Sequence, residues 1–245
     1  MNSSENPLDR VIQETVHLQG GVDLVGDPRQ SLALPAEPVI ALFDVSDDGA
    51  ALIESGATVE RQVAIWVEGR FEADARRLLS HALPPRQGLW WALLSLMEAH
   101  RQKPYPAKVL TAILGVRDFI LNPTDARRRA CKDLAEAAGS TTPGGVIGYA
   151  AFLSGGSMAP ADCPPVLPLP HLCGRLCGVS VYLASVHFNP AKYKDHLRHF
   201  IDIGLQVARD EIPVPGAAVA TETAHVEKLE VEVERVVLQA EARRL

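Results

Sequence analysis

Residues 78–97, LLSHALPPRQGLWWALLSLM, show how the whole chain is organised. Apolar residues recur three and four apart before the two prolines and again after them, which is the spacing of a helix face. Proline is accepted in the first turn of a helix but stops a helix that runs into it, because its nitrogen carries no hydrogen. Pro84 and Pro85 therefore predict a boundary between two helices, the second ending at the basic pair His100 and Arg101.

Similar helix-boundary signals occur both before and after this stretch. Ser46 and Thr58 are predicted N-caps upstream, and Asn122-Pro123 and Thr142-Pro143 are predicted helix starts downstream. Further helices are expected over residues 107–121, 125–138, 143–153, 171–188 and 189–210. The sequence thus predicts an all-α domain over residues 46–212, an irregular multi-helix bundle of about eight to ten antiparallel helices.

The two ends of the chain have different patterns. Residues 1–45 show no sustained period, which predicts an extended N-terminal arm that could form a short strand pair. Residues 213–245 begin as a small-residue linker and continue as a predicted amphipathic tail helix. Its heptad-like stripe comprises Val226, Leu229, Val233 and Val236. EKLEVEVE also alternates as an edge strand would, but the closing RVVLQAEARRL favours helix.

The composition argues against nucleic-acid binding, membrane insertion and a disulfide-rich secreted protein. The chain is 47% hydrophobic and carries 24 Lys and Arg against 30 Asp and Glu, a net charge of -6, which disfavours binding to nucleic acid or an anionic membrane. No apolar run reaches the roughly 18–20 residues of a membrane span, and the first residues lack the pattern of a signal peptide. Four cysteines are not a disulfide framework in a chain this long. We expect a cytoplasmic protein without membrane insertion.

Two groups of residues are candidates for metal ligands. The first comprises Cys163, His171, Cys173 and Cys177, and the second comprises His187, His196 and His199. Zinc takes four such ligands in a tetrahedron, but the first group has no C-x-x-C knuckle, and its last two cysteines lie among small and apolar residues as free cysteines in helix packing do. The second group fits a solvated helix face. We therefore expect no metal and no cofactor.

Two further features were weighed as binding surfaces. Adjacent helix residues point about 100° apart, so Trp90 and Trp91 cannot share one narrow stripe. We favour a central helix that is buried on two sides, and the alternative offers one indole to a partner. The basic run of residues 127–129 has no interleaved aromatic residue and is interpreted as a solvated helix face.

A glycine- and proline-rich loop follows the apolar helix. Gly155 is predicted to take the left-handed conformation that ends this helix, and residues 158–170, MAPADCPPVLPLP, to form polyproline-like coil. Pro165 to Pro168 spells P-x-x-P, but we favour an ordered loop pinned by its apolar side chains Val166, Leu167 and Leu169. The residues assigned to this structural loop are Ser154, Gly155, Gly156, Ser157, Pro165 and Pro168.

Three stretches resemble a known family: residues 78–96, residues 122–137 with NPTDARRRACKDLAEA, and residues 149–170 with YAAFLSGGSMAPADCPPVLPLP. They are similar to an uncharacterised bacterial family of helical proteins with a HALP-x-R…WWA helix and an SGGS-x-AP…PP-x-P-x-P loop. The resemblance covers residues 46–210 and implies a place in gene neighbourhoods of the type VI secretion system. It brings no catalytic motif. The family usually has apolar or small residues where this chain has its three late cysteines.

The function expected from these observations is that of a non-enzymatic accessory or adaptor protein of a type VI secretion apparatus, acting through protein partners. The predicted partner-binding residues are Trp90, Trp91, Val226, Leu229, Val233 and Val236, with self-association through the tail helix as one route to a homo-oligomer. Two alternatives stay open. One is a metal- or ligand-binding enzyme that uses the Cys and His groups, and the other is a structural scaffold subunit.

Overall fold

The computed structural model describes residues 28–160 and 162–215. Within these ranges the chain forms eleven α-helices and one short 3-10 helix, η1, with no β-strand beyond an isolated bridge between Pro35 and Thr58. The elements are α2 Pro28–Ala33, α3 Ala36–Ile40, α4 Asp47–Ala50, α5 Val59–Glu68, α6 Glu72–Ala82, α7 Pro85–Gln102, α8 Ala107–Leu121, α9 Asp125–Ala138, α10 Pro143–Phe152, α11 Leu172–His187, η1 Pro190–Lys192 and α12 Tyr193–Ala208. The predicted all-α fold is confirmed.

Several helices begin where the sequence predicts. Thr58 caps α5 by accepting a hydrogen bond from the Arg61 amide, and Thr142 caps α10 by accepting one from the Gly145 amide. Pro85 lies in the first turn of α7, where its missing N–H leaves no helical bond unmade. The capping residues and prolines therefore set these boundaries locally, before any tertiary contact is considered.

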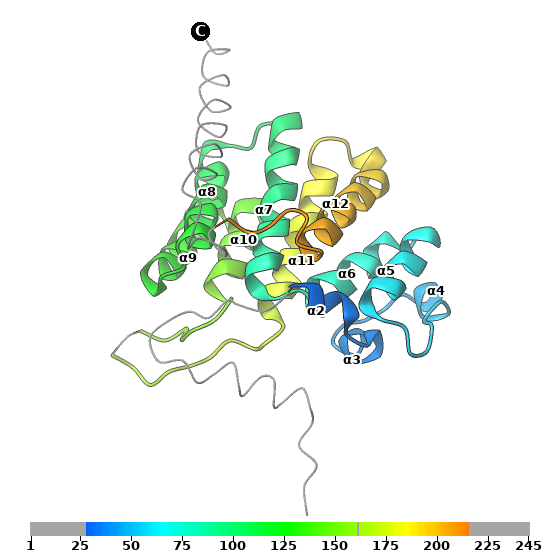
Figure 1. Ribbon diagram of the computed structural model, residues 1–245. Helices are drawn as coiled ribbons and strands as arrows, with labels where there is room; N and C mark the ends of the chain where they lie inside the picture. Colours follow the sequence, from blue (N-terminus) through cyan, green and yellow to red (C-terminus); the bar gives the residue numbers. More distant parts are fainter. Residues whose placement is uncertain (1–27, 161, 216–245) are drawn as a thin grey trace, which may run out of the picture.

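The helices form two groups joined by α7 and α11 (Figure 1). In the first group α8, α9 and α10 pack on one another, and α7 packs against α8 and α10. In the second group the shorter helices α2, α3 and α5 contact α6 or α12. Helix α11 touches α7 and α10 on one side and α6 and α12 on the other. Because α7 is central, its buried residues extend around the helix and include polar Arg86 and Gln87 besides Trp90 and Trp91.

Three tryptophans lie in the core, and two of them, Trp66 and Trp91, donate their indole N–H to backbone carbonyls, whereas Nε1 of Trp90 is buried without a partner among the described residues. The Trp91 indole is fully buried and its Nε1 donates to the Phe200 carbonyl oxygen of α12 at 2.6 Å. The Trp66 Nε1 donates to the Gly49 carbonyl oxygen at 2.8 Å. Trp90 is buried as well, on another side of α7. Helix α7 is thus buried on more than one face, the arrangement that we favoured for adjacent tryptophans.

The structure differs from the sequence prediction in two additional short helices and in the start of one predicted helix. Residues 28–33 and 36–40 are helical, where an extended arm was predicted up to residue 45. Both helices are between one and two turns long, too short to show a period, and each buries apolar side chains, such as Leu32 in α2 and Ile40 in α3. Helix α9 is capped by Thr124 and not by Asn122, because the Thr124 hydroxyl accepts from the Arg127 amide.

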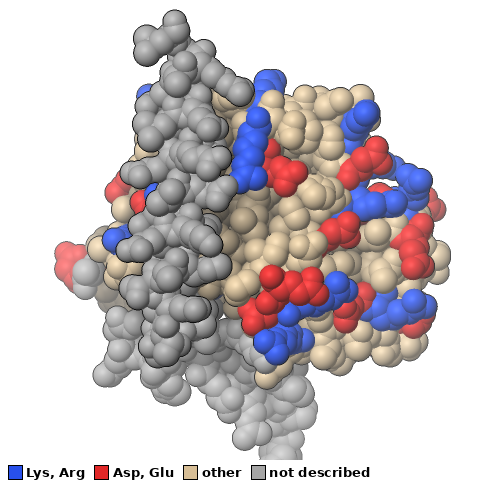
Figure 2. Space-filling model, turned by 45° about the horizontal axis from the view of Figure 1, so that its top comes forward, with Lys and Arg blue, Asp and Glu red and all other residues tan. Residues whose placement is uncertain are grey.

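The surface of the described residues carries charge of both signs. Figure 2 shows Lys and Arg side chains interspersed with Asp and Glu over one face, without a large patch of one sign. Several are paired, as in Arg209 with Glu60 and Arg61 with Glu54. No helix within the described ranges combines the length and the apolar character needed to cross a membrane.

Candidate protein-binding loop

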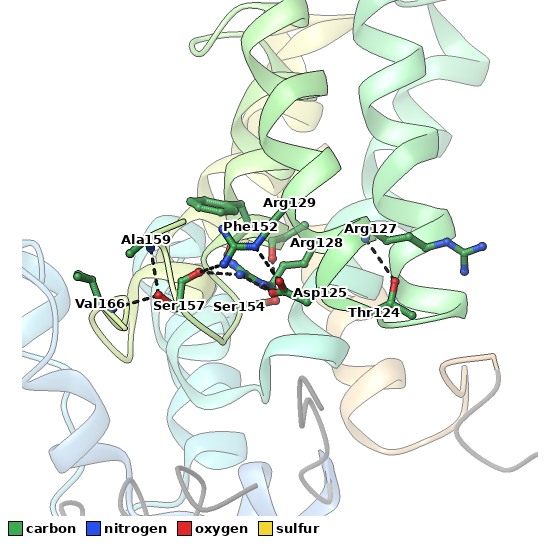
Figure 3. A network of polar contacts seen from close by, with 11 residues as sticks. Thr124, Asp125, Arg127, Arg128, Arg129, Phe152, Ser154, Ser157, Ala159 and Val166 are labelled. Carbon is green, nitrogen blue, oxygen red and sulfur yellow. Dashed lines mark hydrogen bonds and ion pairs between the residues drawn. The ribbon is translucent and has the colours of Figure 1, made fainter. Parts of the chain in front are cut away.

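The site is built around the start of α9. Asp125 occupies the first turn, where a negative charge suits the helix dipole, and it lies three and four residues before Arg128 and Arg129. Oδ1 of Asp125 accepts from Nε and Nη2 of Arg128 at 2.9 and 2.6 Å, and Oδ2 accepts from Nε of Arg129 at 2.7 Å. One carboxylate therefore orients two guanidinium groups toward the end of α10 (Figure 3).

Arg128 connects α9 to the loop that follows α10. Its side chain is fully buried, although it is charged. Nη1 donates to the Phe152 carbonyl oxygen at 2.6 Å, and Nη2 donates to the Ser157 carbonyl oxygen at 2.7 Å. The guanidinium carbon also lies 5.0 Å from the centroid of the Phe152 ring. Because the ion pair and these carbonyl oxygens replace water, burial of the charge is compensated.

Gly156 lies against the guanidinium of Arg128. A Cβ atom at this position would come 3.2 Å from Nε of Arg128, and the backbone φ is +65°. Glycine is the residue that accepts both conditions without strain. The left-handed residue predicted at Gly155 is therefore found one position later, at Gly156.

Ser157 closes the loop at its base. Its Oγ accepts from the amides of Ala159 and Val166 at 3.1 and 3.0 Å, and the Met158 amide donates to the Val166 carbonyl oxygen at 2.7 Å. Nη2 of Arg129 adds a second bond to the Ser157 carbonyl oxygen at 3.1 Å. The segment from Met158 to Val166 is thus a closed loop, which projects from the bundle between α10 and α11 (Figure 1).

The outer side of the loop carries uncovered apolar side chains. Val166, Leu167 and Leu169 are 51%, 53% and 61% exposed, higher than the other large hydrophobic residues that are exposed in the described part of the chain. They belong to residues 164–170, PPVLPLP, which contains no charged residue. We refer to these three side chains as the loop patch. Our prediction that they pin the loop is wrong, because Arg128, Arg129 and Ser157 hold it and the three side chains face solvent.

The charges of the site also affect the acidity of Asp125. Partial burial acts to raise the pKa of this carboxyl group, but the hydrogen bonds and positive charges of Arg129 and Arg128 outweigh it and lower the pKa below its usual value. Asp125 is therefore ionised at neutral pH. Both arginines keep their negative partner there, and with it the geometry that holds Ser157.

Sequence reasoning missed Arg128, which it assigned to a solvated face. The signal was present in the spacing, since Arg128, Cys131 and Ala135 recur three and four apart and all three are buried. Arg127 and Arg129 are more exposed, as predicted for that run. Arginine is usually exposed, so its presence at position 128 predicted a solvated side chain. A buried arginine is expected only where a partner such as Asp125 is close.

The other predicted site residues lie apart from the loop patch. Cys173 and Cys177 are buried on α11 with their Sγ atoms 4.0 Å apart, whereas Cys163 is exposed on the loop. His171 stacks near His81, His187 against Tyr105 and His196 against Phe188, while His199 pairs with Glu98. Among the described residues, no three Cys, His, Asp or Glu side chains are grouped so that they could hold a metal ion.

The predicted partner-binding residues fall into two sets. Trp90 and Trp91 lie in the core, where they stabilise the packing of α7. Val226, Leu229, Val233 and Val236 of the predicted tail helix lie outside the described residues. Ser154 is buried, and its hydroxyl donates to the Ala151 carbonyl oxygen at 2.7 Å, while Pro165 is exposed on the loop and Pro168 is half-buried.

Comparison with known proteins gives one match. Residues 63–208 match a family described as a family of unknown function, DUF6931, and this range covers more than half of the chain, from α5 to the end of α12. It includes both halves of the loop anchor, Asp125 with Arg128 on α9 and Ser157 after α10. No curated protein and no solved structure matches the chain.

Proposed function

We propose that this chain, which belongs to the DUF6931 family, is a non-enzymatic adaptor that binds a protein partner through the loop patch. The observation that carries the proposal is the combination of a buried anchor with uncovered apolar side chains. Arg128 fixes the backbone of the loop, while Val166, Leu167 and Leu169 remain exposed at its outer side.

A binding segment loses conformational entropy when it becomes ordered on a partner. A flexible loop loses much of it in this way, whereas a loop that is already held loses little. Ser157 and the two arginines already hold this loop in the folded chain, so less conformational entropy remains to be lost when a partner binds. The apolar area of the loop patch is then free to contribute to association, and the partner that suits it is a protein with an apolar groove.

We further propose that the partner is a component of a bacterial type VI secretion apparatus. The support is the resemblance of residues 78–96, 122–137 and 149–170 to the helical family described above. Two of these stretches contain the loop anchor. The surface assigned to the partner therefore lies within the segments that carry the resemblance.

The test compares two double variants of the full-length chain. Leu167→Ser with Leu169→Ser makes the loop patch polar, and Leu34→Ser with Leu42→Ser makes the same change at exposed leucines elsewhere. Each tagged protein is expressed in a bacterium with an active type VI apparatus, and the bound proteins are quantified by mass spectrometry. We expect a secretion component to be reduced about tenfold or more by the loop variant, which corresponds to roughly 1.4 kcal/mol of binding free energy. The control variant should retain it.

The possible results distinguish the binding surface, the secretion partner and the adaptor role from one another. An identical set of partners for the loop variant and the wild type would show that the loop patch is not the binding surface. A partner that is lost with the loop patch but lies outside the secretion apparatus would keep the adaptor role and reject the secretion role. Cofractionation with the fully assembled apparatus would separate a permanent scaffold subunit from an adaptor.

A further inference from the structure

Arg76 is a buried arginine away from the loop. It lies on α6 and is 8% exposed, and its guanidinium packs where α11 passes. A Cβ atom at Gly178 would come 2.9 Å from its Nη1, so the glycine leaves room for the group. The guanidinium carbon lies 5.8 Å from the ring centroid of Tyr182, one turn further along α11. The charge is thus held between two helices.

This guanidinium has no hydrogen-bond acceptor among the residues that the structure describes. Its Nε is buried without a partner. The nearest acid along α6, Asp74, is occupied by Ser46 and by Arg77, whose Nη1 donates to it at 2.7 Å. The Ser80 hydroxyl donates to the Arg77 carbonyl oxygen. Asp74 and the ring of Tyr182 lie close enough to favour the charge of Arg76, but no described carboxylate or carbonyl oxygen accepts a hydrogen bond from its guanidinium.

A largely buried cation without a hydrogen-bonded carboxylate opposes folding. Desolvation lowers the pKa of Arg76 to about 10, so that the group stays charged at neutral pH and the fold bears the cost. An apolar side chain of similar length, such as methionine, would avoid this cost between α6 and α11. Arg128 shows the contrast, because it is buried more completely and has Asp125 and two carbonyl oxygens as partners.

We propose that Arg76 is a binding site for a carboxylate, supplied by an aspartate or glutamate side chain of a protein partner. The planar fork of a guanidinium matches the two oxygens of a carboxylate. Tyr182 is 41% exposed beside it, and its ring meets that of Tyr193 edge to face with centroids 6.3 Å apart. Arginine and tyrosine are the residues that most often dominate binding energy at protein interfaces.

The chemistry of the site favours a carboxylate over a phosphate. A phosphate group carries more charge and is usually held by several cations or by a helix N-terminus. At this site the neighbouring cation Arg77 is already bound to Asp74, which leaves the single fork of Arg76. One fork and one carboxylate balance each other in charge. This inference is independent of the loop patch, because it rests on other helices and other residues.

The first measurement uses acetate as the probe on the full-length chain. The Nε–H signal of Arg76 in a ¹⁵N spectrum, assigned with Arg76→Lys, is followed as acetate replaces chloride at constant ionic strength. We expect a saturable shift with acetate and none with chloride. Inorganic phosphate is titrated in the same way. A saturable response to phosphate and none to acetate would overturn the assignment to a carboxylate.

The second measurement compares thermal unfolding of Arg76→Met with Arg101→Met, which removes the same charge from an exposed position. In chloride we expect Arg76→Met to unfold at the same temperature as the wild type or higher. In acetate the wild type and Arg101→Met should gain stability, since a ligand that binds the folded state stabilises it, and Arg76→Met should not. A strong loss of stability in Arg76→Met, or an equal response of all three proteins to acetate, would show that Arg76 is a structural residue only.

Discussion

The Nη2 atom of Arg128 donates to the carbonyl oxygen of Ser157 at 2.7 Å, so that one buried side chain of α9 holds backbone 29 residues further along the chain. The bond joins α9 to the loop that follows α10, and Nη2 of Arg129 adds a second bond to the same carbonyl oxygen at 3.1 Å. The other partners of Arg128 are Asp125 and Phe152.

Arg128→Met should destabilise the fold by about 2–4 kcal/mol, because the Phe152 and Ser157 carbonyl oxygens lose their charged donor. Urea unfolding of the full-length chain measures the change. Arg127→Met is the matched control, since this exposed neighbour should change the free energy of unfolding by less than about 0.5 kcal/mol. Equal effects of the two variants would contradict the role of Arg128.

Gly156→Ala should cost more than Gly56→Ala. Both glycines have a positive φ, +65° and +72°, so each substitution bears the strain of a left-handed alanine, about 1 kcal/mol. At Gly56 a Cβ atom meets nothing within 4 Å, whereas at Gly156 it lies 3.2 Å from Nε of Arg128. The difference between the two free energies of unfolding measures the close approach alone. A larger cost at Gly56 would place the Arg128 contact in doubt.

Asp125→Asn should remove a part of the stability that depends on pH. The pKa of Asp125 is lower in the folded chain than its unfolded value of about 3.9, so its contribution is present in full above about pH 5 and is lost as the pH falls through the folded pKa. The carboxylate is half-exposed, and we expect a difference of about 1 kcal/mol or less at pH 7. Unfolding at pH 7 and pH 3 should show this difference shrinking in acid. A difference that stays constant would contradict the ion pair.

His100→Asn should make stability less sensitive to mild acid. Nδ1 of His100 accepts from the Tyr105 amide at 2.9 Å, which requires that nitrogen to be unprotonated. Burial and the charge of His187 lower the pKa of His100, so the unfolded chain binds the proton more strongly. Stability is therefore full above the unfolded pKa of about 6.5 and falls as the pH drops below it. Unfolding at pH 7.5 and pH 5 should show a smaller loss in the variant, whose amide oxygen can still accept.

The helix boundaries that local chemistry sets could be predicted from the sequence. Thr58, Thr142 and Pro85 act within one turn of their own position, and their effect does not depend on the rest of the fold. At Asn122-Pro123-Thr124 two cap residues compete, and the geometry selects Thr124. The helices over 28–33 and 36–40 are held by tertiary burial, which no local pattern records.

The sequence predicts where the loop lies and that it is coil, but it does not predict which residues anchor the loop. Its proline content identifies residues 158–170 as coil, whereas the anchor Arg128 lies 29 residues before Ser157 and on another helix. The exposure of Leu167 and Leu169 was missed for a related reason. Apolar residues in an ordered loop are expected to face the core. They can stay exposed where polar contacts at other residues hold the loop in place.

The loop is closed at Ser157 by hydrogen bonds that do not involve the side chains at its tip. The bonds at its base use the Ser157 hydroxyl and backbone atoms of Met158, Ala159 and Val166. Side chains between these points can be exchanged without breaking a bond of the base. The base of the loop can therefore keep its hydrogen bonds while the side chains at the tip are replaced, and the fold sets no fixed chemistry for the exposed part of the loop.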